Sequence, residues 1–274
     1  TDYRPPASPG VFVPPQLPAR EWLGRFQPFI LDDLAEFTLE GPPALDSAEY
    51  ARDLAEVRAL GGQRGAARSA EQGDAAQFWH STDIGQLLPG VFEAPQRTLA
   101  DNARFFAAWS TAMFDAGIVL SREKYRHNFW RPVTAIRNAD LDGNPLTARD
   151  ETWEPLLATP AHPDYPCGHC LVGAMMASLL EAGAGSPPEG VVVRRGNGRD
   201  ASADTPARRF DTWAQMAEEI ALSRIWGGVH FRRGATDGAG LGQRIAARAL
   251  QRFGVTAARG RRISDARGPV DRAP

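Results

Sequence analysis

The sequence predicts an all-α fold of packed helical bundles. Apolar residues recur at helical spacing in several long stretches. By contrast, β-branched residues form one short run, at 191–193, inside a stretch from 183 to 207 that is rich in Gly, Ser, Pro and Arg. The chain has 274 residues, of which 43% are hydrophobic, so it can bury a large core. We see no internal repeat and expect one domain.

The chain divides by composition into three parts. Residues 1–45 carry many prolines together with Trp22, Phe26 and Phe29 but show no clear periodicity, which indicates an extended arm lying on the body of the protein. Residues 46–255 form the helical domain. Residues 256–274 are rich in arginine and predict a loosely held tail.

Within the helical domain, capping residues and apolar spacing mark the elements. Asp46 or Ser47 can cap the first helix, and Ser69 the second. Prolines between 160 and 166 exclude a helix interior there. The stretch 183–207 predicts a long surface loop that can hold a small hairpin. The predicted helices span about 47–60, 69–80, 99–118, 171–180, 206–225 and 236–253, and the pattern of 126–138 continues the third helix directly or after a break.

Charge and composition exclude some classes of function. The formal net charge is −2, and the arginines are scattered among acids, so no nucleic-acid module is indicated. No apolar run approaches the roughly 18 residues of a membrane span. The start at Thr1, followed by prolines, is typical of a processed mature end, and we expect export to the periplasm or the medium. Two cysteines do not settle the compartment.

Lys124 is the single lysine of the chain. A solitary ammonium among arginines indicates a place where a planar guanidinium does not fit, although a surface lysine kept by accident is the alternative. Arg131 follows seven residues later. Residues seven apart on a helix differ by about 20° in azimuth, so the two cations would point the same way. Two cations directed at one place predict an anion site.

Two further segments offer groups that bind oxyanions. Residues 166–169, Pro-Cys-Gly-His, form a turn that leads directly into an apolar helix, whose free N–H groups and dipole favour an anion. Arg224 and His230 flank a Gly-Gly pair at 227–228. A straight helix would place the two side chains about 120° apart, so the glycines are needed for them to converge.

Together the three segments resemble the signature of the vanadium-dependent haloperoxidases and the related type 2 phosphatidic-acid phosphatases and bacterial acid phosphatases. That signature reads Lys-x6-Arg-Pro, then Pro-Ser-Gly-His, then Ser-Arg-x5-His. It covers residues 124–230, and the flanking runs 129–137 and 161–166 are similar to soluble bacterial haloperoxidase-like members. The resemblance implies a helical-bundle fold with the anion site in the bundle core.

The resemblance also implies a cofactor and residue roles. Vanadate, or phosphate in the same site, would be held by Lys124, Arg131, Cys167, Gly168 and Arg224. His230 would bond vanadium in a peroxidase or attack phosphorus in a phosphatase, and His169 would be the acid–base partner. His162 would line the halide side of the pocket. His80 and His127 lack such context and are interpreted as structural.

Three departures from the signature concern the site. Cys167 replaces the serine, and a thiol is the weaker hydrogen-bond donor. Cys170 allows a local disulfide and a redox-gated site, and it completes a Cys-x-x-Cys run, but the helical context speaks against a thioredoxin-like fold. Gly234 stands where the family usually has an acid four residues after the histidine. Asp237 is the expected replacement, as the carboxylate that fixes the His230 tautomer.

We therefore expect a vanadium-haloperoxidase-like oxidoreductase that uses peroxide and a halide on a small-molecule substrate. An acid phosphatase acting on phosphate esters is the first alternative, since free thiols near the site would be exposed to an oxidant product. A degenerate member with a binding role is the second. A homodimer is compatible with the sequence.

Overall fold

The computed structural model describes residues 7–14, 17–88, 97–187, 189–196, 202 and 204–255. Helix dominates this part of the chain, with one two-stranded sheet, so the predicted all-α class is confirmed. The helices are α1 (Ala48–Gly61), α2 (Ala70–His80), α4 (Leu99–His127), α5 (Pro132–Arg137), α6 (Gly168–Ala184), α7 (Trp213–Trp226) and α8 (Arg232–Phe253). The strands are β1 (Val191–Arg194) and β2 (Ala207–Phe210), paired antiparallel.

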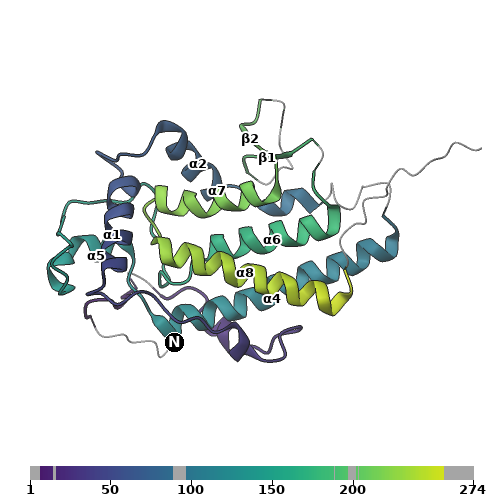
Figure 1. The fold of residues 1–274 in the computed structure, drawn as a ribbon, viewed down its shortest axis with the longest axis horizontal. Coiled ribbons are helices and arrows are strands. Elements are labelled where there is room, and N and C mark those ends of the chain that lie inside the picture. The colour runs from purple at the N-terminus through teal and green to yellow at the C-terminus, as the bar shows by residue number, and fades with distance from the viewer. Residues whose placement is uncertain are drawn as a thin grey trace, which may run out of the picture.

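Helices α4, α6, α7 and α8 form the central bundle, and α1 stands across one end of it (Figure 1). The main core lies between these helices and includes Leu171, Met175 and Ile245. Helices α6 and α8 touch backbone to backbone, because a Cβ on Gly242 would overlap the Leu171 carbonyl and one on Gly238 would lie 2.5 Å from the Cys167 carbonyl oxygen. This contact fixes the start of α6 against α8.

The first helix starts are confirmed and have clear local causes. The Ser47 side chain accepts a hydrogen bond from the backbone N–H of Tyr50, which caps α1. Ser69 and Gln72 form a reciprocal capping box at α2. Such caps satisfy N–H groups that have no partner inside the helix.

The chain breaks between α4 and α5, which decides the question left open by the sequence. Asn128 is in the left-handed region, with φ 47°, and caps the end of α4. Arg131 is extended, and Pro132 begins α5, a position where a missing N–H costs nothing. Lys124 and Arg131 therefore do not share one helix. The azimuth argument for their common direction is wrong, and the fold brings them together by another route.

Two other boundaries differ from those predicted. The helix expected over 206–225 begins only at Trp213, capped by Thr212, because residues 207–210 pair with β1 in the hairpin that the loop was expected to allow. The last helix begins at Arg232 instead of near 236. His230 lies two residues before this start, so the histidine sits at the junction of two helices.

The N-terminal segment contacts the central bundle along α4. It includes the short 3-10 turns η1 (Glu21–Arg25) and η2 (Leu34–Phe37), so it is less extended than expected. The buried Asp115 carboxylate on α4 accepts hydrogen bonds from three successive backbone N–H groups, those of residues 29–31. Residues 1–6, 15–16 and 256–274, which include the expected tail, lie outside the described residues. Among the helices that are described, none has the length and apolarity of a membrane span.

Candidate anion site

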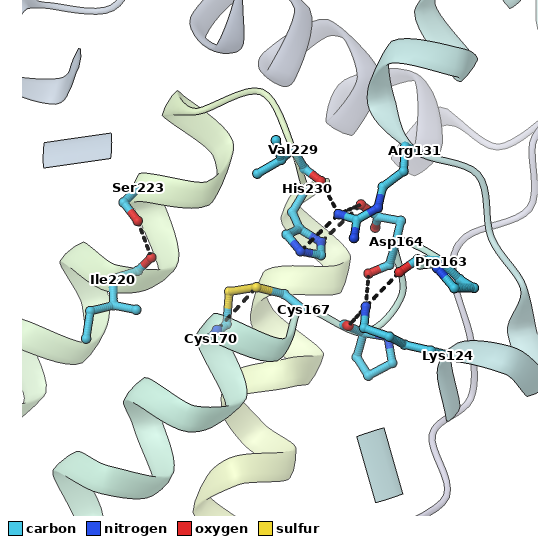
Figure 2. The surroundings of a disulfide bond; sticks show 11 residues. Lys124, Arg131, Pro163, Asp164, Cys167, Cys170, Ile220, Ser223, Val229 and His230 are labelled. Carbon is cyan, nitrogen blue, oxygen red and sulfur yellow. Dashed lines mark hydrogen bonds and ion pairs between the residues drawn. A yellow bond between two sulfur atoms is a disulfide. The ribbon is translucent and has the colours of Figure 1, made fainter. Parts of the chain in front are cut away.

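The three sequence segments converge at one end of the central bundle. Lys124 comes from the end of α4, Arg131 from the turn before α5, Arg224 from the end of α7 and His230 from the α7–α8 junction. All four side chains are buried, with exposed fractions of 1–3%. Figure 2 shows Lys124, Arg131 and His230 directed toward the residue 163–167 loop. Residues about 100 positions apart in the sequence thus lie in one buried, polar cluster.

Lys124 has partners that the sequence did not reveal. Its Nζ donates to the backbone oxygens of Pro163, Asp164 and Pro166 at 2.7, 2.9 and 2.6 Å. An ammonium has three protons, so all are engaged with this loop. Burial lowers the pKa of Lys124 well below its usual value, and the charge of Arg131 lowers it further. Lys124 therefore fastens the loop, and its expected direct contact with an anion would require it to exchange a carbonyl partner.

Arg131 is held on two sides. Its Nε donates to the His162 carbonyl at 2.8 Å, and its Nη1 to the Val229 carbonyl at 2.6 Å. The same Nη1 lies 3.2 Å from Nε2 of His230, and Nη2 lies 2.9 Å from Nδ1 of the His162 ring. The guanidinium is rigidly placed and keeps its positive charge next to His230.

Arg224 differs from Lys124 and Arg131 because two of its N–H donors are not used in hydrogen bonds to the described residues. Its Nε and Nη1 are buried and have no hydrogen-bond partner within the described part of the chain. Its neighbour Ser223 turns away and donates to the Ile220 carbonyl at 2.6 Å (Figure 2). Leaving a buried guanidinium nitrogen unpaired is costly, so an unpaired pair of donors indicates a binding position for an anion.

The glycine pair after Arg224 makes the convergence possible, as predicted from the sequence. Gly228 has φ +73°, a conformation that side-chain-bearing residues rarely adopt. The backbones of Gly228 and Gly61 are in direct contact, so that a Cβ on either would overlap the other. The chain can thus turn sharply against the end of α1, between Arg224 and His230.

The turn at residues 166–169 has the predicted form. Cys167 is the N-cap of α6 and Gly168 its first residue, so the first N–H groups of the helix have no partner in a preceding turn. Cys167 and Cys170 form a disulfide, which settles a point that the sequence left open. The Cys167 Sγ also accepts from the Cys170 N–H at 3.2 Å. A bonded sulfur has no proton, so Cys167 offers no side-chain donor to an anion.

His169 is the most accessible member of the group. His169 is an exposed residue at the start of α6, whereas His230 is buried. The surrounding protein, followed by the positive charges of Arg224, Arg131 and Lys124, lowers the pKa of His169. The ring is neutral at neutral pH and can accept a proton.

The carboxylate beside His230 is Asp164, which corrects the expectation for Asp237. The Nδ1 atom of His230 lies 3.0 Å from Asp164 Oδ1 (Figure 2). Asp237 faces the other side of Tyr165, where its Oδ2 accepts from the Tyr165 hydroxyl at 2.5 Å and from Arg233 Nε at 2.6 Å. In the sequence Asp164 stands in a proline-rich run between Pro163 and Pro166, and its place just before the 166–169 turn was the available signal.

Two other histidines lie close to the group. His162 is half-buried and supports Arg131 through both its ring and its carbonyl, and its expected place on the halide side stays a prediction. His80, interpreted from the sequence as structural, ends α2 near the pocket. Burial lowers its pKa, and the charge of Arg224 lowers it further; its own charge in turn acts on His169. Nothing in the α2 sequence indicated this proximity, because α2 carries no motif residue.

Comparison with known proteins agrees with this arrangement. Residues 104–257 match the family model described as the VCPO second helical-bundle domain. Vanadium chloroperoxidase from Curvularia inaequalis is 29% identical in an alignment 174 residues long that covers 48% of this chain and 28% of that protein.

Solved structures show the same fold. The first bacterial vanadium-dependent iodoperoxidase superposes with a TM-score of 0.72 and 26% identity, covering 93% of this chain and 63% of that one. An apo-type bacterial vanadium-dependent chloroperoxidase, at 19% identity and a TM-score of 0.69 over 85% of this chain and 55% of that one, supports the fold alone.

The chain spans 28% of the curated relative and 63% of the iodoperoxidase chain. The family match itself covers more than half of the present chain. It extends across all three site segments. The chain therefore belongs to the family of the VCPO second helical-bundle domain, within the vanadium haloperoxidase superfamily.

Proposed function

We propose that this chain binds vanadate and oxidises a halide with peroxide, as a vanadium-haloperoxidase-like oxidoreductase. The observation that carries the proposal is the buried Arg224 guanidinium, whose Nε and Nη1 have no partner among the described residues. A buried cation without a partner destabilises a fold, so its presence favours a site built around an anion. Vanadate and phosphate both meet that requirement, and the family relationship favours vanadate.

The residues present suit a tetrahedral or trigonal-bipyramidal oxyanion. Arg224 and the first N–H groups of α6, beginning with Gly168, would donate to its oxygens. Lys124 and Arg131 would add positive charge behind them. Nε2 of His230 would be the atom that bonds vanadium. When bound there, vanadate supplies the Lewis acidity that activates peroxide toward a halide.

His169 would move the proton. Its imidazole is the accessible base of the site, and its lowered pKa keeps one ring nitrogen free to accept a proton from an incoming peroxide. The same nitrogen can return the proton to the departing oxygen. His162 would keep Arg131 in place on the side where a halide is expected to enter.

The disulfide removes an objection to this chemistry. Free thiols next to a source of hypohalous acid would be oxidised stepwise to sulfenic and sulfonic acids. Both cysteines of the chain are joined in the Cys167–Cys170 disulfide, and no free thiol remains. The disulfide therefore favours the haloperoxidase interpretation over the phosphatase interpretation more strongly than the sequence alone did.

The test is bromination of a phenolic dye by the purified chain with and without vanadate, peroxide and bromide. We expect turnover only when all three are present. Arg224→Ala should lower it by a factor of about 100 or more, the usual effect of losing a donor to developing negative charge. Arg248→Ala is the matched control, since Arg248 pairs with Glu36 on the surface.

Other results would overturn the proposal in a defined way. Hydrolysis of an aryl phosphate, inhibited by vanadate and without any bromination, would identify a phosphatase. Binding of vanadate or phosphate without either reaction would indicate a protein that keeps the scaffold for binding.

A further inference from the structure

Hydrogen bonds at both the N–H and the carbonyl of Asp164 hold its backbone and so fix the position of its carboxylate. Its N–H donates to the Phe129 carbonyl at 2.9 Å, and its own carbonyl accepts from Lys124 Nζ at 2.9 Å. The side chain is 1% exposed. Its ionic neighbours within the described residues are His230 Nδ1 at 3.0 Å and Arg131 Nη1 at 3.8 Å. A carboxylate fixed in this way can orient the imidazole next to it.

Because Gly234 has no side chain, the space beside it is free for the Asp164 carboxylate. Gly234 lies in the first turn of α8, four residues after His230. A Cβ on Gly234 would lie 3.0 Å from Asp164 Oδ2, closer than most real Cβ contacts. Its carbonyl accepts from the Cys167 N–H at 2.9 Å, so the helix backbone cannot move away without disturbing the start of α6. Any side chain at 234 would therefore compete with Asp164 for one position.

Both neighbours of the His230 ring favour the same tautomer. Asp164 Oδ1 lies 3.0 Å from Nδ1, although neither atom makes a hydrogen bond at the angle of this contact, so the negative charge of the carboxylate is what favours the proton on Nδ1. The Arg131 guanidinium next to Nε2 has only protons to offer, so it favours an Nε2 without one. The unprotonated nitrogen is then Nε2, the atom that the proposed function needs as a vanadium ligand.

We propose that Asp164 is the positioning residue for His230 and that Gly234 is its steric counterpart, so the two form a matched pair. The carboxylate reaches His230 from the loop before α6. Helix α8, which follows His230, contributes only the space left by the missing side chain of Gly234. This inference rests on the proposed function for the use of Nε2, but the position and tautomer of the ring are properties of the chain itself.

The tautomer can be measured without vanadate. Two-bond ¹H–¹⁵N spectra of protein labelled at histidine report which ring nitrogen carries the proton, and the chain has only five histidines. His230→Gln assigns the signal. At a fixed pH of about 8, we expect the wild-type ring to be the Nδ1–H form. Asp164→Ala should convert a large part of it to the Nε2–H form.

The exchange variant tests the pairing. In Asp164→Ala/Gly234→Asp, the carboxylate grows from the position whose Cβ points at the former Asp164 oxygen, and it should restore the Nδ1–H form. Gly234→Ala alone should displace Asp164 and give part of the Asp164→Ala effect. Gly240→Ala is the matched control on the same helix, because a Cβ there meets nothing within 4 Å. Asp237→Asn should leave the ring signal unchanged.

Orthovanadate and phosphate affinities supply a second readout. Loss of the Asp164 partner should weaken orthovanadate binding about 10- to 100-fold, and the exchange variant should recover most of it. Circular dichroism shows which variants are folded, and Gly234→Ala keeps the test valid if Asp164→Ala is not. An unchanged tautomer in both single variants, or no recovery in the exchange variant, would overturn the inference. Failure of the wild type to bind vanadate would count against the proposed function alone.

Discussion

The Nζ atom of Lys124 and the backbone of Asp164 are joined by a 2.9 Å hydrogen bond, so the only lysine of the chain holds the loop that carries the carboxylate beside His230. The ammonium completes its coordination with the carbonyls of Pro163 and Pro166. A guanidinium is planar and larger, and it cannot present three protons to three carbonyls around one nitrogen. This geometry explains why position 124 is a lysine and not an arginine.

Replacing Lys124 should therefore damage the loop as well as the charge of the site. We expect Lys124→Met to lower the free energy of unfolding by about 3 kcal/mol or more, since three buried carbonyls lose their donor. Lys124→Arg should rescue little of it. Urea unfolding measures the change. A loss below about 0.5 kcal/mol in both variants would show that the loop is held by other contacts.

The Gly61–Gly228 contact should be equally intolerant. We expect Gly228→Ala to cost about 2 kcal/mol or more, because the residue has a positive φ and its Cβ would overlap the Gly61 carbonyl. The same substitution at Gly240, an open helical position, should be neutral or stabilising by up to about 1 kcal/mol. Thermal or urea unfolding separates the two. Equal effects at both positions would contradict the close contact.

The disulfide should limit the affinity of the site for oxyanions. In Cys167→Ser/Cys170→Ala a hydroxyl proton becomes available at the N-cap of α6. We expect orthovanadate or phosphate to bind roughly 2- to 10-fold more tightly, the ordinary effect of one added hydrogen bond. Cys167→Ala/Cys170→Ala lacks both the bond and the hydroxyl and serves as the control. If the two variants bind alike, the serine position does not face the anion.

Reduction of the wild type should act in the opposite direction. A thiol released at a helix N-terminus beside several cations ionises readily, and its negative charge would repel an oxyanion. We expect weaker phosphate binding after treatment with a reductant, with no change in a variant that lacks both cysteines. Isothermal titration of each form measures it. Identical affinities before and after reduction would exclude redox gating of the site.

His162 should make stability fall in acid. Burial, with the charges of Lys124 and Arg131, lowers its pKa to about 2. In the unfolded chain the ring has a pKa near 6.5, so below that pH it binds a proton that the folded ring does not bind. The contribution of His162 to the free energy of unfolding is therefore fully present above about pH 6.5 and is lost as the pH falls below it. The limiting slope is about 1.4 kcal/mol per pH unit.

The comparison variant is His162→Gln, whose amide oxygen can still accept from Arg131. The difference in unfolding free energy between wild type and variant should shrink steadily from pH 6.5 to pH 4.5. A difference that is constant over this range would mean that the ring is protonated in the folded protein.

Much of the fold and of the site followed from local sequence. Ser47 and Ser69 were recognisable as caps because they precede helical spacing, and capping is a local interaction. The turn at Gly168 and the bend at the glycine pair before His230 could be predicted in the same way. In each case the residue type and its immediate neighbours determine the backbone, so one sequence is enough.

The misjudged features depend on contacts between distant segments. The carboxylate for His230 was sought at Asp237, nearby in sequence, whereas Asp164 reaches the ring from 66 residues upstream. The carbonyl partners of Lys124 lie about 40 residues downstream of it. Every residue has a backbone oxygen, so the residue types do not show which oxygens will accept a hydrogen bond. Asn128 tolerates the left-handed conformation that ends α4, but the same residue is also common inside loops and helices, so the break was not decidable.

The glycine seam between α6 and α8 has a consequence for protein engineering. Gly238 and Gly242 place the two helix backbones in contact at Cys167 and Leu171, directly behind the turn that offers its N–H groups to the anion. At these two points the nearest atoms are backbone atoms of the facing helix, so no side chain there can be repacked to absorb a change of helix spacing. Transplanting the site into another scaffold requires moving the two helices together as a single rigid unit.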